Sequence, residues 1–232
     1  MLRLRELDGL EPGRLLDVGS GKGRFLDGAR EAGWHVVGVE FAAAAAAESR
    51  ARGLDVRVGD ILDVELEGPF DAVTFWHVLE HLPDPGAALD RVRDLMPPGG
   101  RLIVSVPNLD SFQARLFGPA WFHLDLARHL HHFTPGSLRQ LLQRHGFVVD
   151  RVGFFYPEME AAGLVQSSLN RLGFEADRLY RFLKRDPTAT QDAQTAASIG
   201  LAVALAPVAA AWSLVAPLVS SGASMQVVAH RG

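Results

Sequence analysis

Five short apolar runs alternate with amphipathic or alanine-rich stretches over the first 107 residues of the chain. Apolar runs that are bounded by Gly, Pro or Asp are typical of buried parallel strands, and the stretches between them are long enough for crossover helices. The pattern therefore predicts a doubly wound α/β sheet. The expected strands are 15–18, 35–40, 55–60, 71–76 and 101–107, and the expected helices are 23–32, 42–52 and 85–95.

The remainder of the chain predicts one more helix, over 136–145, and two more strands, over 146–152 and 224–230. About seventy residues separate these two strands, and they form an amphipathic stretch, 158–185, and a stretch without Asp, Glu, Lys or Arg, 193–229. The length of the second stretch allows one membrane crossing, which needs ~20 apolar residues. Pro207, Pro217 and the return to the sheet favour instead a buried helical pair, which caps the site, forms a dimer face or rests on a membrane surface.

A glycine-rich loop follows the first strand. Asp17 ends the apolar run, and Gly19, Gly21 and Gly23 alternate with small or polar residues before the next helix. Glycine allows positive φ and a close approach of the backbone to a ligand, and the helix start directs free N–H groups to the same place. The loop predicts a nucleotide-like cofactor. A nicotinamide or flavin site favours G-x-G-x-x-G, but here the third glycine comes one residue too early.

The run from Asp17 to Gly23 resembles motif I of the class I S-adenosylmethionine-dependent methyltransferases. The later run F-D-A-V, V-L-E-H and L-M-P-P-G-G-R-L, within 70–102, is similar to the same family, in the branch that contains quinone-biosynthesis O-methyltransferases. The resemblance implies a seven-stranded, mostly parallel sheet of order 3-2-1-4-5-7-6 with an antiparallel last strand. We expect a Rossmann-like domain over 1–157 and 223–232 and a helical insert over 158–222.

The resemblance also implies how the site is built. Glu40, 17 residues after Gly23, would accept both ribose hydroxyls, and Asp60 would lie near the adenine amino group with Ile61 beside the ring. The implied activity is transfer of a methyl group from S-adenosylmethionine to a small-molecule acceptor by in-line displacement. The expected cofactor-binding residues are Asp17, Gly19, Ser20, Gly21, Gly23, Glu40, Phe41, Asp60, Ile61, Trp76 and His77.

The histidines leave two interpretations open. The string from His77 to His81 matches H-x-x-E-H of zinc proteases, but it follows a strand and has no third ligand at a fixed spacing, so we predict no metal site there. His77 is instead expected to contact cofactor or substrate. Four histidines within 123–132 could bind a metal or shape a substrate pocket, and we favour the pocket, with His129 or His132 as a general base.

Charge and composition limit the kinds of molecule that the protein is expected to bind. The net charge of −4 and the lack of a basic cluster exclude a typical nucleic-acid surface. The chain has no cysteine and a charged N-terminal segment unlike a signal peptide, which favours the cytoplasm, and its bias to Arg over Lys favours a bacterial source. The sparse charge of 193–229 indicates an apolar acceptor and allows a homodimer or contact with a membrane surface. The alternatives are a cofactor-binding protein without catalysis and a nicotinamide-dependent oxidoreductase.

Overall fold

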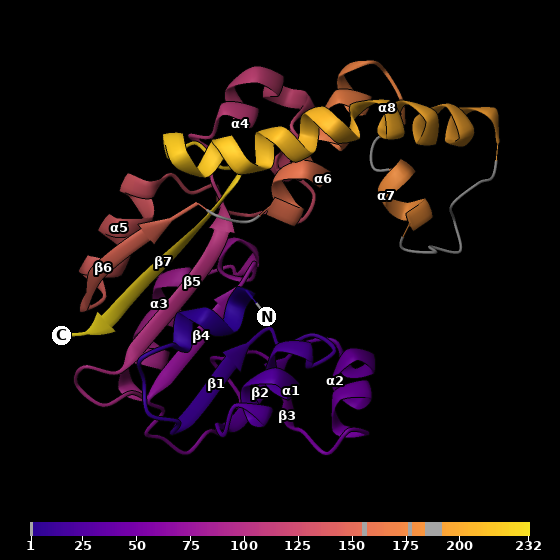
Figure 1. Ribbon diagram of the computed structural model, residues 1–232. Coiled ribbons are helices and arrows are strands. Elements are labelled where there is room, and N and C mark those ends of the chain that lie inside the picture. The colour runs from indigo at the N-terminus through magenta and orange to yellow at the C-terminus, as the bar shows by residue number, and fades with distance from the viewer. Residues whose placement is uncertain (1, 155–156, 176–177, 184–191) are drawn as a thin grey trace. The chain divides into compact units, whose positions relative to one another are not determined.

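The computed structural model describes residues 2–154, 157–175, 178–183 and 192–232. One seven-stranded sheet has the order β3-β2-β1-β4-β5-β7-β6, in which β7 runs against the other strands (Figure 1). This confirms the order and the antiparallel last strand that the family resemblance implies. The strands are β1 Arg14–Val18, β2 His35–Glu40, β3 Asp55–Val58, β4 Ala72–Trp76, β5 Arg101–Pro107, β6 Phe147–Gly153 and β7 Ser224–Arg231.

The centre of the sheet is apolar on both faces, as expected for parallel strands that helices cover on each side. All five residues of β4 are buried, and so are the last four residues of β1. In the pairing of these strands Asp17 lies opposite Thr74 and Val18 lies opposite Phe75. Because β1, β2 and β4 are parallel and in close register, the loops that follow them meet at one edge of the sheet.

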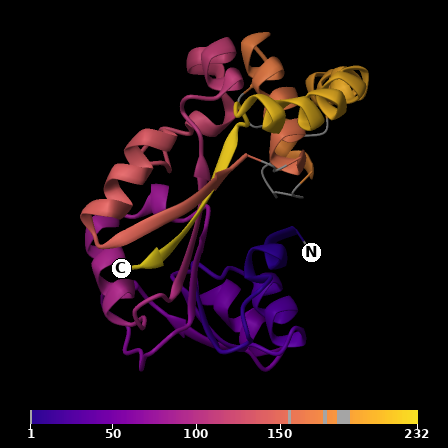
Figure 2. The ribbon, with the colours of Figure 1, turned by 60° about the vertical axis from the view of Figure 1, so that its left-hand side comes forward.

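Helices cover both faces of this sheet. Figure 2 shows η1, α1 and α2 on one side of the strands, and α3 and α5 on the other. α3 begins where the sequence signals it, because Asp84 accepts a hydrogen bond from the Ala87 N–H at 2.8 Å and Pro85 occupies the first turn. The helices are η1 Leu2–Leu7, α1 Arg24–Glu31, α2 Ala43–Arg50, η2 Leu79–His81, α3 Pro85–Asp94 and α5 Pro135–Arg144.

The chain divides into two compact units. The first comprises residues 1–106, 136–152 and 226–232, and the second comprises 107–135 and 153–225. The second unit thus contains the segment 158–222 together with the connector that follows β5, although 176–177 and 184–191 of the expected insert lie outside the described residues. Its helices are α4 Phe112–Phe117, η3 Gly118–Ala120, η4 Phe122–Leu124, α6 Pro157–Arg171, α7 Arg178–Leu183, α8 Ala193–Val215 and η5 Ala216–Val219.

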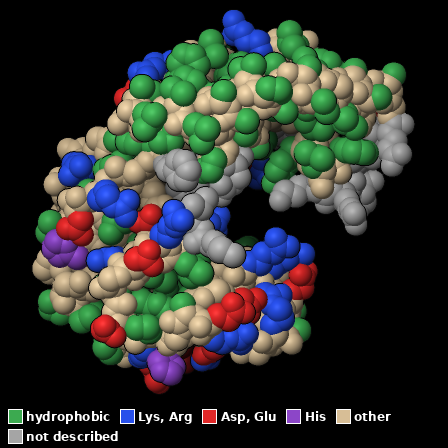
Figure 3. All heavy atoms as spheres, in the orientation of Figure 1, with side chains coloured by type: hydrophobic (Ala, Val, Ile, Leu, Met, Phe, Trp, Pro, Cys, Tyr) green, Lys and Arg blue, Asp and Glu red, His purple; other side chains and the backbone are tan. Residues whose placement is uncertain are grey.

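The prolines of the uncharged segment predict interruptions, and the structure differs at Pro207. α8 continues through Pro207 as one helix, because the alanine-rich turns on both sides favour helix strongly enough to tolerate one missing hydrogen bond. Only 17% of its most apolar window is buried inside the single chain, so this chain alone does not bury the segment, and its role as a cap, dimer face or membrane-proximal element stays a prediction. Residues 193–219 are long and apolar enough to cross a membrane, and Figure 3 shows hydrophobic side chains along them.

A buried carboxylate organises the second unit. Glu160 on α6 accepts hydrogen bonds from Gln113 Nε2 and Trp212 Nε1, each at 2.7 Å, and from the Ala223 N–H at 2.6 Å. Burial raises the pKa of Glu160, and these three donors oppose that shift by stabilising the ionised form. One side chain therefore connects α4, α6, α8 and the segment that enters β7.

Candidate functional site

A pocket of about 510 Å³ lies in the first unit, where the loops after β1, β2, β3 and β4 meet. Such a volume is typical of small-molecule sites. Six of the predicted cofactor residues line it, namely Gly19, Glu40, Phe41, Asp60, Ile61 and His77. The remaining lining residues are Val18, Val39, Gly59, Val78, His81, Leu82 and Pro83.

The three glycines of the loop all adopt a left-handed backbone, with φ of 71° at Gly19, 53° at Gly21 and 70° at Gly23. At Gly19 the space is also closed, since an added Cβ would lie 2.3 Å from Cγ2 of Val78. Gly23 is the N-cap of α1. The glycines are therefore required by the course of the chain itself as well as by any ligand that approaches it.

The carboxylates after β2 and β3 are fixed by backbone donors. Glu40 accepts from the Gly21 N–H at 2.7 Å and from the Ala42 N–H at 2.8 Å, so it connects the end of β2 to the glycine loop. Asp60 accepts from the Leu62 N–H at 2.9 Å. The Phe41 side chain is 81% exposed, so it presents an apolar surface at the pocket that the described residues leave mostly open.

Five residues that were predicted to bind the cofactor do not line the pocket, namely Asp17, Ser20, Gly21, Gly23 and Trp76. Asp17 is buried and accepts a hydrogen bond from Thr74 Oγ1 at 2.7 Å. Burial raises its pKa to about 7, while the Thr74 hydrogen bond and the positive charge of Arg3 act in the opposite direction. The Trp76 ring packs edge-on against Phe25, with centroids 5.2 Å apart. Asp17 and Trp76 are therefore held by contacts with Thr74 and Phe25.

Arg3 is a residue that sequence reasoning missed. Its guanidinium lies 5.0 Å from the ring centroid of Trp76, and its charge acts on Asp17. It thus supplies a positive charge next to the glycine loop. Nothing in the short segment around Arg3 distinguishes it from a surface arginine, because its position depends on how η1 packs on the sheet.

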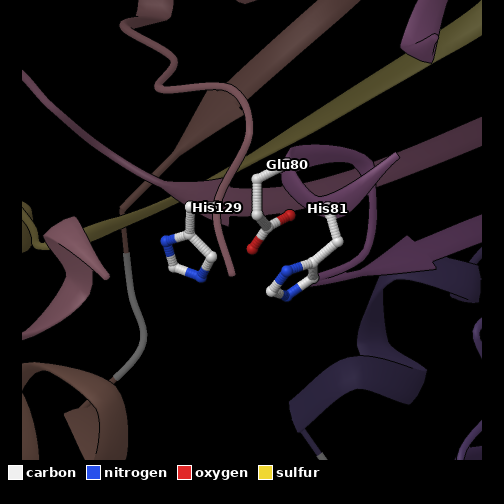
Figure 4. Close-up of side chains that lie close together, drawn as sticks. All are labelled: Glu80, His81 and His129. Atoms are coloured by element: carbon white, nitrogen blue, oxygen red, sulfur yellow. The ribbon is translucent and has the colours of Figure 1, made fainter. Parts of the chain in front are cut away.

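His77 leaves β4 with an unusual backbone and two polar neighbours. Its φ is 57°, its Nε2 lies 3.3 Å from Ser105 Oγ, and its Nδ1 lies 3.4 Å from Glu80 Oε1. Figure 4 shows Glu80 and His81 leaving the same short turn, η2. The H-x-x-E-H string therefore occupies a strand-to-turn connection, whereas its zinc-protease counterpart needs a long helix.

His129 and His132, the other predicted bases, belong to the second unit. His129 donates its Nδ1 proton to the carbonyl of His123 at 2.9 Å, and His132 donates its Nε2 proton to the carbonyl of Leu124 at 2.6 Å. Because a carbonyl only accepts, these bonds define which nitrogen of each neutral ring carries the proton. His129 is also drawn in Figure 4.

The second unit has a cavity of its own, of about 270 Å³, between α6, α7 and α8. Alanine side chains from α6 and α8 are too small to fill this space. Two polar side chains, Gln166 and Tyr180, belong to its wall. The lining residues are Phe122, Ala161, Ala162, Val165, Gln166, Leu179, Tyr180, Leu183, Ala202, Ala206, Ala209 and Ala210.

Comparisons with known proteins agree with this geometry. A family model described as "Methyltransferase domain" matches residues 2–152. A protein named ubiquinone biosynthesis O-methyltransferase from Xylella fastidiosa is 32% identical over 157 residues, which are 62% of this chain and 64% of that protein. Its namesake from Alkalilimnicola ehrlichii is 37% identical over 111 residues, 44% of each chain. The chain thus spans less than two thirds of the length of these curated relatives.

Solved structures share the fold at low identity. A S-adenosylmethionine-dependent methyltransferase from Mesorhizobium loti is 21% identical with a TM-score of 0.60, and the match covers 99% of this chain and 96% of that one. Phosphoethanolamine N-methyltransferase 2 from Haemonchus contortus, solved with S-adenosylmethionine, is 16% identical with a TM-score of 0.65 over 98% of this chain and 51% of that one.

Proposed function

Because the chain belongs to the class I S-adenosylmethionine-dependent methyltransferases, we propose that it transfers a methyl group from S-adenosylmethionine to a small-molecule acceptor. The observation that carries this proposal is one pocket that collects the glycine loop, the acid after β2 and the acid after β3. An oxidoreductase would need a third glycine at a different spacing, which this loop does not have.

The pocket residues fit the cofactor. Gly19 presents bare backbone at the wall, and the Glu40 and Asp60 carboxylates can accept from the ribose hydroxyls and the adenine amino group. Ile61 and Phe41 offer apolar surface to the adenine ring. Asp17, Ser20, Gly21, Gly23 and Trp76 would maintain the loop that carries these contacts. When bound, the cofactor supplies a methyl group that its sulfonium leaving group already activates.

The protein then has to hold the acceptor in line at ~3 Å from the methyl carbon and exclude water. For a hydroxyl acceptor it also has to remove a proton. His77 is the proposed base of the first unit, since it lines the pocket. His129 and His132 are the proposed candidates of the second unit.

The proposed acceptor is apolar and carries a hydroxyl group. Support for an apolar acceptor comes from the second unit, whose cavity of about 270 Å³ is lined mainly by alanine and other apolar side chains. Support for oxygen as the methylated atom comes from the relatives, which are named O-methyltransferases. We assign the choice of acceptor to the second unit.

Calorimetric titration with S-adenosylmethionine and S-adenosylhomocysteine, with NAD as the comparison ligand, tests the cofactor. We expect micromolar binding of the first two and none of NAD. Asp17→Ala should abolish that binding while the circular dichroism spectrum is retained, and Glu65→Ala, at an exposed position, should bind as the wild type does. Binding of NAD, or of none of the three ligands, would overturn the proposal.

α8 and η5 have an apolar face that is open to solvent. The four side chains that form it are 60–84% exposed, namely Val203, Val208, Leu214 and Leu218. Monomeric proteins seldom leave such a face uncovered. Surface-binding helices usually carry Lys or Arg toward anionic lipid, and 193–229 has neither. We therefore propose that a second copy of the chain covers this face and that the dimer acts in the cytoplasm.

A further inference from the structure

Glu80 is a buried acid that the proposed chemistry has not yet used. It is 1% exposed, and among the described residues neither carboxylate oxygen has a hydrogen-bond partner. Within the first unit its polar neighbours include His77, with Nδ1 at 3.4 Å from Oε1, and His81, which has a ring nitrogen within 4.8 Å of a carboxylate oxygen. Burying a carboxylate without donors is unfavourable, so an acid at this position needs a reason beyond packing.

His77 is held in place by strain as well as by contacts. A φ of 57° is uncommon for a residue with a side chain and is unfavourable for the backbone. The neighbouring strand holds the backbone there, because the His77 N–H donates to the Ser105 carbonyl at 2.9 Å. This conformation places the ring in the pocket wall, between Ser105 of β5 and Glu80 of η2.

We propose that Glu80 and Ser105 are positioning residues, which hold His77 with its proton on Nδ1 and leave Nε2 as the atom that accepts a proton from the acceptor. This rests on the proposed methyl transfer. An ionised carboxylate only accepts hydrogen bonds, so the nitrogen that faces Glu80 carries the proton. Nε2 then has a lone pair, to which the Ser105 hydroxyl, 3.3 Å away, donates until an acceptor binds.

The charges balance in the transfer itself. The acceptor O–H bond breaks and its proton forms a bond with Nε2 of His77, while the oxygen electron pair forms the new bond to the methyl carbon. The bond between sulfur and that carbon breaks, and sulfur keeps its electrons. One positive charge is thereby lost at sulfur and gained at the imidazole, where the Glu80 carboxylate stabilises it.

Long-range ¹H–¹⁵N spectra of the uniformly labelled full chain test this arrangement without knowledge of the acceptor. The His77 signals are identified by their loss in His77→Asn, since the chain has nine histidines. At pH 8 we expect wild-type His77 to carry its proton on Nδ1. In Glu80→Leu the proton should move to Nε2, because the N–H can then donate a hydrogen bond to the Ser105 hydroxyl oxygen. Ser105→Ala should keep the wild-type tautomer.

Glu65→Leu, which removes an exposed acid, is the matched control and should leave the His77 signals unchanged. A purely structural role of Glu80 would lower the melting temperature without moving the proton. Wild-type His77 protonated on Nε2 would overturn the inference even if no variant folds. Titration with S-adenosylhomocysteine separates the two proposals, because its failure with wild type refutes the methyl transfer and leaves the tautomer result as it stands.

Discussion

At the residue scale, the residues of the glycine loop have an unusual backbone conformation, and at Gly19 the backbone rather than a side chain forms the pocket wall. Gly19 and Gly21 have similar positive φ, but only Gly19 is closed in by another side chain. Asp17 lies beneath them with its charge largely removed from water. The closed space at Gly19 and the burial of Asp17 lead to separate predictions, one about an added methyl group and one about ionisation of the carboxyl group.

Gly19→Ala should reduce both stability and cofactor affinity, because the new methyl group would overlap Val78 Cγ2, 2.3 Å away. Gly21→Ala is the matched control, with the same left-handed strain of about 1–2 kcal/mol but no protein atom within 4 Å of the added Cβ. Chemical unfolding should show a larger loss for Gly19→Ala. Equal losses in the two variants would mean that Val78 moves aside at no cost.

Asp17→Asn should gain stability relative to wild type as the pH rises. The folded-state pKa of about 7 exceeds the ordinary value of 3.8, so ionisation of Asp17 destabilises the folded protein increasingly between pH 4 and pH 7. At ~1.36 kcal/mol per pKa unit, the variant-minus-wild-type difference should increase by on the order of 4 kcal/mol from pH 4 to pH 8. Urea unfolding at both pH values measures it, and a constant difference contradicts a raised pKa.

At the element scale, the second unit depends on a few polar contacts among helices that are otherwise poor in large side chains. α8 contributes mostly alanine to its contacts with α6, as the wall of the 270 Å³ cavity shows. Small side chains bury little apolar area, so hydrogen bonds to buried groups gain in relative weight. Glu160 and Trp212 form the contact that defines how α6 and α8 pair.

Trp212→Phe should destabilise the protein by about 1.5–3 kcal/mol, because it removes a donor to a buried carboxylate at 2.7 Å. Glu160→Gln keeps the shape of the site and removes the charge. Chemical unfolding of wild type, the two single variants and the double variant gives the coupling free energy of the pair. A coupling within 0.5 kcal/mol of zero, the usual additivity error, would show that the two residues act independently.

At the scale of the whole molecule, the face of α8 and η5 should determine the oligomeric state. Sedimentation analysis should find wild type as a dimer, and Val203→Gln with Leu218→Gln should shift it to monomer, because these side chains are 69% and 84% exposed in a single chain. Leu62→Gln with Val148→Gln, at exposed positions of the first unit, is the matched control and should remain dimeric.

A monomeric wild type would contradict the covered face. Flotation with phosphatidylcholine vesicles distinguishes the remaining occupant, since binding that is lost in the Val203 and Leu218 double variant would assign the face to lipid. We expect wild type to remain at the bottom of the gradient and not to float with the vesicles.

The amino-acid sequence alone predicted the strand and helix positions of the first unit, and its resemblance to a known family implied the sheet order. The element positions follow from apolar periodicity, and the resemblance rests on short motifs such as the glycine spacing of 19, 21 and 23; both signals act over a few residues. Six of the predicted cofactor residues line one pocket because they follow parallel strands and so meet at one edge. Their binding roles remain predictions.

Which side chains lie beneath the pocket, and which face each other, depends on the tertiary structure. Asp17 and Thr74 are 57 positions apart, and the contact of Glu160 with Trp212 spans 52. The neighbours of His77, Ser105 and Glu80, come from a second strand and a turn. Such contacts depend on strand register and on how helices pack, and residue spacing along the chain contains no measure of either. The course of α8 through Pro207 was decided in the same way, by the sum of its alanine-rich turns rather than by one proline.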